Sequence, residues 1–417
     1  MKRVIVVGAG ASGLMAAYAA AAGGCEVTVL EKNEKAGKKI YITGKGRCNV
    51  TNDTSSEGVL ENVVHNAKFL TGAAHAFPPE RMMRFLEESG LPLKVERGNR
   101  VFPASDKASD VTKCLERYCR SAGVLFRFGK NVSCIERGED SFSVEAAGEK
   151  LVADAVIVCT GGLSYPSTGS TGDGYAFARS FGLRVVAPRA ALCGIECGGT
   201  GELQGLSLKN VTLHARAQKR EYSHFGEMLF THFGISGPIA LTLSSEINDE
   251  DLSRVRLWLD LKPALDEGTL DRRLLRDIDK YKNKQMRNAL AELLPKALIA
   301  PVLQRAGVPE DLPANSLTKG SRAALLRAIK AFSLVPVRLR PVEEGIVTAG
   351  GIEVKEIDPR TMMCKKVPGL YFCGEVLDVD ALTGGFNLQI AFMTGYAAGK
   401  AVSCASDVPP ERQKEDE

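Results

Sequence analysis

The chain has 417 residues, more than one typical hydrophobic core holds, and its length predicts two or three packed units. Its 54 basic and 50 acidic residues leave a net charge of only +4, so we expect no nucleic-acid partner. Eleven cysteines without regular spacing predict reduced thiols and a cytoplasmic protein, and no apolar run approaches the roughly 18 residues of a membrane-spanning helix.

The first elements along the chain predict a βαβ unit. Residues 4–7 form a β-branched run, residues 8–13 a glycine-rich turn, residues 14–22 an alanine-rich helix and residues 27–30 a second strand. Further buried strands are predicted at 125–128 and 155–159, and helices at 79–88 and 111–122. The first 188 residues therefore predict an α/β fold with a parallel sheet.

The pattern changes after residue 188. Alternating residues at 211–215 and 255–259 predict a small antiparallel sheet or barrel, and leucines at helical spacing (Leu290, Leu293, Leu294 and Leu298) predict a helical subdomain. Glycine-rich strand and turn character returns after Pro341, with a buried strand at 370–372. We predict a discontinuous Rossmann-like nucleotide-binding domain (1–188 and 341–405), a β-barrel-like middle domain on the substrate side (189–264 and 333–340), a helical subdomain (265–332) and a disordered tail (406–417).

The turn after the first strand carries a dinucleotide-binding pattern. Gly8, Gly10 and Gly13 match G-x-G-x-x-G, in which glycines permit a tight turn and a close approach of the backbone to a pyrophosphate. The following helix offers free N–H groups and the positive end of its dipole to the phosphates. Glu31 ends the second strand, where a carboxylate accepts hydrogen bonds from the adenosine ribose.

Two late segments favour FAD over NAD. Residues 371–375 repeat a strand and a glycine turn more than three hundred residues after the first, which suits a long ligand with a flavin at its far end. Residues 383–388 open an apolar helix (389–398), whose N-terminal dipole could stabilise negative charge at N1 and C2=O of a reduced flavin. The alternative is a C-terminal helix that only packs on the sheet.

The chain resembles the BaiN/YhiN-like family of FAD-dependent oxidoreductases, which includes an aminoacetone oxidase and bile-acid reductases. The resemblance extends from Gly8 to about Gly399, with landmarks at residues 43–49, 160–174, 226–238 and 345–351. It implies a Rossmann-type FAD domain, a barrel-like domain and a helical domain, with the adenine against the backbone of Val132, the ribityl chain near Gly374 and the flavin facing Leu388. The residues expected at the cofactor are Gly8, Gly10, Ala11, Ser12, Gly13, Glu31, Lys32, Gly44, Arg47, Asn49, Val132, Gly161, Gly374, Glu375, Asp378, Gly385, Asn387 and Leu388.

Two side chains are candidate proton donors. His232 lies in the middle domain and titrates near neutral pH, although a histidine flanked by phenylalanines is often structural. Tyr165, next to a pair of glycines, is the second candidate. The histidines and cysteines have no metal-ligand spacing, so we expect no metal.

We expect an NAD(P)H-dependent reductase that passes hydride through flavin N5 to a conjugated carbonyl group of a small molecule. A second G-x-G-x-x-G is lacking, so NAD(P)H would dock transiently as a co-substrate. One alternative is a flavin oxidase of a small amine that uses oxygen. Another is a flavin-bearing RNA-binding or RNA-modification protein. The sequence predicts no membrane partner, and it leaves the oligomeric state and the choice of NADH or NADPH open.

Overall fold

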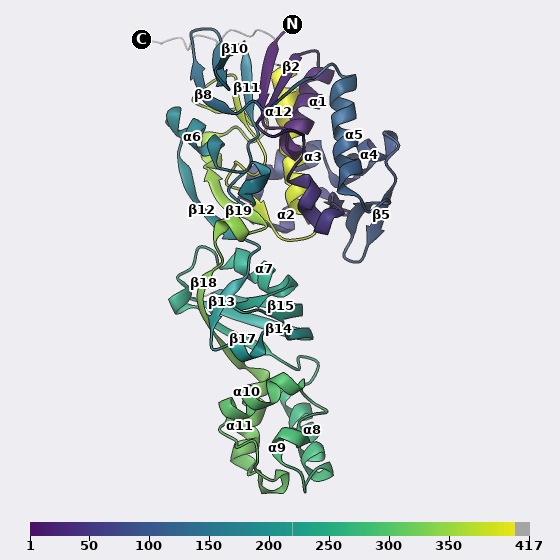
Figure 1. The fold of residues 1–417 in the computed structure, drawn as a ribbon, viewed down its shortest axis with the longest axis vertical. Coiled ribbons are helices and arrows are strands. Elements are labelled where there is room, and N and C mark those ends of the chain that lie inside the picture. Colours follow the sequence, from purple (N-terminus) through teal and green to yellow (C-terminus); the bar gives the residue numbers. More distant parts are fainter. Residues whose placement is uncertain (219, 405–417) are drawn as a thin grey trace, which may run out of the picture. The chain divides into compact units, whose positions relative to one another are not determined.

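The computed structural model describes residues 1–218 and 220–404 (Figure 1). The chain divides into two compact units, one formed by Met1–Arg189 with the described residues from Val342 on, and one formed by Ala190–Pro341. The predicted tail at 406–417 lies outside the described residues. Among the described residues, no helix combines the length and the apolar character that crossing a bilayer requires.

A parallel sheet forms the centre of the first unit. Its strand order is β20 (Leu370–Phe372), β11 (Ala155–Val158), β1 (Arg3–Val7), β2 (Glu26–Glu31) and β7 (Leu125–Phe128). The central strands β1 and β11 are buried almost throughout, as expected for a sheet covered on both faces. The discontinuous α/β fold predicted from the sequence is therefore confirmed.

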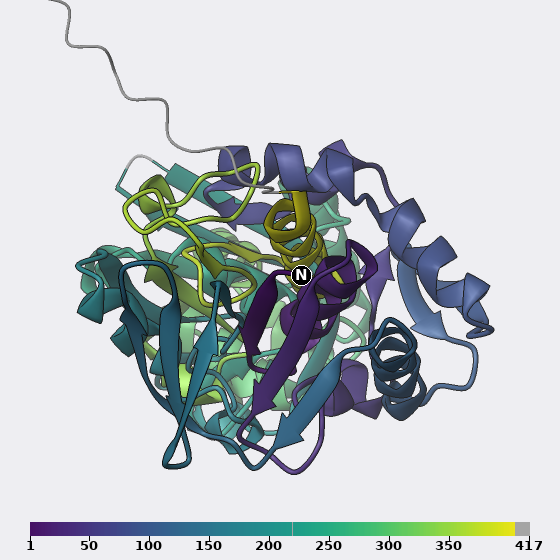
Figure 2. The same ribbon diagram turned by 90° about the horizontal axis from the view of Figure 1, so that it is seen from above.

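Two helices from opposite ends of the chain pack against each other beside this sheet. Helix α1 (Ala11–Ala22) lies against α12 (Phe386–Cys404), as the purple and yellow ribbons of Figures 1 and 2 show. A Cβ atom added at Gly395 would lie 2.3 Å from the carbonyl oxygen of Ser12, and one at Gly399 would lie 2.4 Å from that of Ala16. The two backbones thus touch only because α12 carries glycines four residues apart.

Smaller elements surround the sheet and the helix pair. The helices are α2 (Ser56–Glu61), α3 (Thr71–Ala76), α4 (Pro79–Glu88), α5 (Ala108–Ser121) and α6 (Asp173–Ser180). The added sheets are β3 (Thr51–Asn52) with β6 (Arg100–Pro103) and β5 (Leu93–Glu96), β8 (Val132–Arg137) with β9 (Phe142–Ala146) and β10 (Glu149–Ala153), β4 (Val63–His65) with β21 (Asp380–Ala381), and β12 (Val185–Ala191) with β19 (Val347–Ile352).

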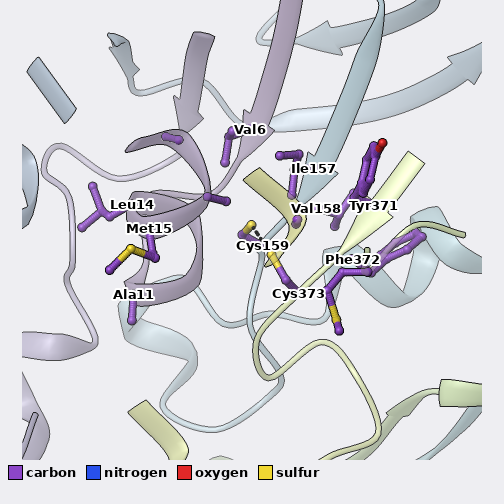
Figure 3. Close-up of a cluster of buried hydrophobic side chains, with 14 of the residues drawn as sticks. Val6, Ala11, Leu14, Met15, Ile157, Val158, Cys159, Tyr371, Phe372 and Cys373 are labelled. Atoms are coloured by element: carbon purple, nitrogen blue, oxygen red, sulfur yellow. Dashed lines mark hydrogen bonds between the residues drawn. The ribbon is translucent and has the colours of Figure 1, made fainter. Parts of the chain in front are cut away.

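Two cysteines meet in the core at the carboxyl ends of β11 and β20. The sulfur atoms of Cys159 and Cys373 are 3.1 Å apart, and Figure 3 shows them facing each other among side chains of α1 and the sheet. Burial raises the pKa of the Cys373 thiol well above its usual value. This keeps the Cys373 thiol protonated and unreactive, and both side chains are buried, so we interpret the pair as packing residues of the core.

The second unit contains a closed barrel and a group of helices. The barrel order is β13 (Ile195–Gly198), β16 (Gly234–Ser236), β15 (Arg220–Phe230), β14 (Ser207–Ala217), β17 (Arg256–Asp260) and β18 (Phe332–Leu339). The helices are α7 (Pro238–Glu246), α8 (Glu267–Lys280), α9 (Met286–Ala289), α10 (Lys296–Ala306) and α11 (Lys319–Lys330). Their apolar side chains and those of the barrel form one continuous core. The predicted barrel and helices are confirmed.

One detail of the helical region differs from the prediction. The periodic leucines do not share one helix, because Leu290, Leu293 and Leu294 lie in the turn between α9 and α10. All three are nevertheless buried. Pro295 explains the break, because proline disfavours helical geometry at the residue before it.

Candidate functional site: a dinucleotide cradle

The glycine turn between β1 and α1 is packed tightly except at one position. A Cβ at Gly8, whose φ is +99°, would lie 2.6 Å from the carbonyl oxygen of Cys159, and a Cβ at Gly13 would lie 1.9 Å from that of Gly8. At Gly10 the same atom would meet nothing within 4 Å. Gly8 and Gly13 are therefore needed by the protein itself, whereas Gly10 borders open space of the kind that a pyrophosphate would occupy.

Helix α1 presents an uncapped N-terminus at this turn. Gly10 is its N-cap residue and supplies no side-chain hydrogen bond, so the first N–H groups, those of Ala11, Ser12 and Gly13, have no capping side chain. The first turn of α1 also lacks acidic residues. Free N–H groups and the positive end of a helix dipole together favour a bound phosphate.

Glu31 lies beside the turn, and hydrogen bonds hold both of its carboxylate oxygens in place. The side chain is 7% exposed and accepts hydrogen bonds from the backbone N–H of Ala9 (2.7 Å) and from the backbone N–H (2.8 Å) and side-chain amide (2.7 Å) of Asn33. Asn33 donates twice to Oε1, whereas Oε2 accepts only from Ala9 and keeps a lone pair for a further donor such as a ribose hydroxyl. The backbone N–H of Lys130 bonds the carbonyl of Glu31 at 2.9 Å and brings the chain before Val132 to the same place.

The Lys32 side chain contacts protein groups at the start of α6. Its ammonium group bonds the Asp173 carboxylate at 2.6 Å and the Thr171 hydroxyl at 2.5 Å, at the start of α6. Gly161, with φ +73°, begins the loop that leads to these residues. The structure therefore connects the end of β2 to the loop after β11, and direct contact between Lys32 and a cofactor stays a prediction.

Glu375 holds three segments together behind the cradle. Its carboxylate pairs with the Lys39 ammonium at 2.6 Å and accepts hydrogen bonds from the Ser164 hydroxyl at 2.8 Å and the Thr348 backbone N–H at 2.9 Å. Burial alone would raise the pKa of Glu375, but Lys39 and these hydrogen bonds hold it below its ordinary value. Gly374, with φ +79°, sits so close to α1 that a Cβ there would lie 2.5 Å from the Ser12 hydroxyl.

The loop at residues 43–49 has an unusual backbone. Gly44, Lys45, Gly46 and Cys48 all have positive φ, between +56° and +85°, and two of them are not glycine. Such strain often marks a functional site. The side-chain oxygen of Asn49 is buried without a partner among the described residues, which leaves a polar atom available to a ligand.

Arg47 is engaged by protein groups. Its guanidinium pairs with Asp106 at 2.7 Å and with Glu96, and it lies 4.1 Å from the ring centre of Phe102. The two carboxylates compensate its charge. Its expected contribution of positive charge beside a flavin stays a prediction.

A second helix N-terminus, that of α12, is shaped by Gly385 and Asn387. Gly385 has φ +100°, and a Cβ there would lie 2.4 Å from the carbonyl oxygen of Thr51. The Asn387 amide accepts a hydrogen bond from the Ala381 N–H (2.9 Å) and donates to the Ala381 carbonyl (2.7 Å). Leu388 is half-buried. The turn before α12 is therefore fixed by its own amide hydrogen bonds, and its helix is longer than predicted.

The family model described as HI0933-like protein Rossmann domain matches residues 2–401. The chain belongs to this family. The resemblance to the BaiN/YhiN-like proteins is thereby confirmed, and the chain is an FAD-dependent oxidoreductase by family. The open space at Gly10, the uncapped α1 and the unpartnered oxygen of Asn49 fit FAD.

Similar proteins have different names. The chain is 32% identical over 411 residues to the 3-dehydro-bile acid delta(4,6)-reductase of Clostridium scindens, covering 97% of this chain and 99% of that one. It is 30% identical over 409 residues to the ribosomal RNA dihydrouridine synthase of Escherichia coli, covering 97% of each. The solved 3-ketosteroid-delta4-(5alpha)-dehydrogenase of Rhodococcus jostii has a TM-score of 0.52 at 14% identity, covering 96% and 97% of the two chains, which shows a shared fold.

The two predicted proton donors lie in different units. His232 is exposed in the second unit, between β15 and β16, with its ring edge-on to Phe233 at 5.1 Å. Tyr165 lies in the first unit, in a left-handed conformation (φ +52°) after Gly161. Neither role is tested by these positions, and both stay predictions. Across the described residues, no group of three or more His, Cys, Asp and Glu side chains is placed to hold a metal ion.

Sequence reasoning missed a group of polar residues near the start of α12. His65 of β4 bonds Asp380 of β21, and Asn66 donates from its side-chain amide to Asp378, the one member of the group predicted at the cofactor. The partners are more than three hundred residues apart in sequence. No local pattern signals such a pairing, because it depends on which strands meet in the folded chain.

Proposed function

We propose that this flavoenzyme reduces a carbon–carbon double bond conjugated to a carbonyl group, with NAD(P)H as the electron donor. One observation carries the proposal: the names of two relatives, each covered almost completely by this chain, both denote the reduction of a double bond, in different substrates. The name delta(4,6)-reductase of a 3-dehydro-bile acid describes the saturation of double bonds that are conjugated to a ketone. A dihydrouridine synthase saturates the uracil double bond that is conjugated to a ring carbonyl.

The residues of the first unit suit this task. FAD, when bound, supplies a carrier that takes up two electrons from one substrate and gives them to another as hydride. Gly10 and the first turn of α1 would hold its pyrophosphate, and Glu31 its ribose hydroxyls. Gly385 and Asn387 would place the N-terminus of α12 beside the flavin, where the helix dipole stabilises negative charge.

A small-molecule enone is the first candidate substrate, supported by the relative with the highest identity among those described above. Ribosomal RNA is the second. The overall charge argues against RNA, but the charge is uneven, because residues 265–332 carry 13 basic and eight acidic side chains. Exposed cations cluster in the sequence at Lys282 and Lys284, between α8 and α9, and at Arg287 in α9.

A visible absorption spectrum tests the proposal. Purified protein would be titrated anaerobically with NADH and then NADPH, and the reduced protein would be mixed with 4-androstene-3,17-dione, the enone bound by the Rhodococcus relative in fold, or with protein-free ribosomal RNA. We expect a nucleotide to bleach the FAD band and one acceptor to restore it. A different result is an FAD band that is bleached by a primary amine, but by neither nucleotide, and then restored by oxygen. That result would contradict the reductase and identify an amine oxidase.

A further inference from the structure

A pair formed by a half-buried histidine and a buried aspartate joins strand β4 to strand β21 in the first unit. The two strands are antiparallel, with Asp380 opposite His65, and the Nδ1 atom of His65 lies 2.5 Å from Oδ1 of Asp380. Asp380 is fully buried, whereas the His65 side chain is 22% exposed. The imidazole is therefore anchored at one nitrogen, and its Nε2 atom has no hydrogen-bond partner in the described part of the chain.

Two polar atoms near this pair are not explained by a purely structural role. The second carboxylate oxygen of Asp380 and the Nε atom of Arg189 are both buried without a partner among the described residues. Buried polar atoms without partners are costly and uncommon, and they suggest a ligand or a proton that the protein exchanges. Arg189 and Asp378 are the other charged groups that act on His65.

The electrostatics of the pair favour a charged imidazole. The hydrogen bond to Asp380 raises the pKa of His65, and burial and the Arg189 charge oppose this rise less strongly. Burial raises the pKa of Asp378, so the Asp378 carboxyl group competes less with Asp380 for the positive charge of His65. His65 thus carries a dissociable proton over the pH range in which histidines act as general acids.

The pair is built into the turn that precedes α12. Ala381 follows Asp380 directly, and its N–H and carbonyl groups are the ones bonded by the Asn387 amide in the first turn of that helix. The backbone N–H of Leu382 bonds the carbonyl of Asn62, just before β4. The chain therefore fixes His65 and the N-terminus of α12 in one hydrogen-bonded assembly.

We propose that His65 is the general acid of the reduction, and that Asp380 is the positioning residue that holds its ring. This rests on the proposed function and names the proton donor for it. The β carbon of the conjugated double bond receives a hydride, a hydrogen with two electrons, for which NAD(P)H is the source. The electron pair of the double bond then forms a new C–H bond at the α carbon with the proton from Nε2 of His65, and the neutral ring regains a proton from water.

The test separates the half-reactions and uses His65→Gln, Asp380→Asn and a control. The control is His224→Gln, because His224 makes a matching 2.5 Å contact with Glu246 in the second unit. Each protein would be reduced anaerobically with dithionite and reoxidised in a stopped-flow instrument with 4-androstene-3,17-dione or with protein-free ribosomal RNA. Flavin content and the thermal midpoint would show that each variant is folded.

We expect His65→Gln to slow reoxidation about 100-fold, with flavin reduction by NAD(P)H changed less than twofold. Wild-type reoxidation should slow as pH rises through the pKa of His65, Asp380→Asn should move that profile to lower pH, and His224→Gln should match the wild type. Wild-type speed in His65→Gln, or an unmoved profile in Asp380→Asn, overturns the role of His65. A wild-type enzyme that neither acceptor reoxidises instead overturns the proposed function and the inference with it.

A second readout needs no turnover. The chain has five histidines, and ¹⁵N labelling of their rings allows His65 to be assigned by its loss in His65→Gln. We expect its imidazole to titrate above 6.5, the ordinary value, in the wild type and closer to that value in Asp380→Asn. Equal titration in both proteins would contradict the positioning role of Asp380.

Discussion

Gly10→Ala should separate cofactor binding from folding. The backbone at Gly10 (φ −77°, ψ −171°) suits alanine, and the added methyl group would meet nothing within 4 Å in the protein itself. Alanine there should stabilise the flavin-free protein by about 0.5 kcal/mol, because it restricts the unfolded chain. The same methyl group would stand between the backbone and a pyrophosphate. Losing two charge-assisted hydrogen bonds of about 1.5 kcal/mol each would raise the Kd for FAD roughly 100-fold.

Gly13→Ala provides the contrast. Its Cβ would lie 1.9 Å from the carbonyl oxygen of Gly8, so the turn must move before any cofactor binds. We expect the flavin-free protein to lose about 1–3 kcal/mol or more of its free energy of unfolding. Gly201→Ala is the control for the first variant, since Gly201 also borders open space but lies in the second unit.

Urea unfolding of the flavin-free proteins and FAD titration by fluorescence quenching would measure both effects. We expect Gly10→Ala to match Gly201→Ala in its free energy of unfolding and to differ from it in FAD affinity. If Gly10→Ala binds FAD as tightly as the wild type, the backbone at Gly10 does not approach the pyrophosphate. If it unfolds as readily as Gly13→Ala, the space beside Gly10 is not open.

Three further predictions concern other contacts of the first unit. Lys39→Met should lower the free energy of unfolding by about 3 kcal/mol at neutral pH, because Glu375 loses its partner. Because the pKa of Glu375 is lower in the folded state than in the unfolded state, the pair stabilises the fold above a pH of about 4.5. This stabilisation is lost as the pH falls through the folded pKa. The free energy of unfolding of Lys39→Met in urea should therefore change less between neutral and acid pH than that of the wild type. Glu31→Gln should raise the Kd for FAD about tenfold in a fluorescence titration, while Glu26→Gln, at the exposed start of the same strand, should leave it unchanged. Asn387→Ala removes hydrogen bonds to the turn before α12 and should lower the free energy of unfolding, measured in urea, by about 2 kcal/mol. An unchanged free energy of unfolding would mean that the turn is stable without these hydrogen bonds.

The sequence predicts the elements whose signals are local. The β-branched run of β1, the glycine turn and the alanines of α1 each determine their own conformation, and the structure has all three. The strand at Leu370–Phe372 was also predictable, because a short apolar run before a glycine indicates a buried strand. Its place next to β11 confirms the discontinuous domain.

Contacts between distant segments were not predictable in the same way. Arg47 pairs with Glu96 at the end of β5 and with Asp106 before α5, and sequence spacing gives no signal for either pairing. The His65–Asp380 pair arises only when β4 and β21 align in one register. A side chain's partner is set by strand pairing and packing, and a single sequence contains no direct signal for either.

The topology separates the residues expected to hold FAD from the second unit. The second unit leaves the first after β12 and returns before β19, and these two strands pair with each other. An insertion whose ends lie side by side can change in sequence without moving the sheet, because it has its own core. All the residues expected to hold FAD lie in the first unit, so the requirements of the cofactor constrain that unit most strongly. Differences in substrate between relatives should therefore be sought first in residues 190–341, because that unit has a core of its own.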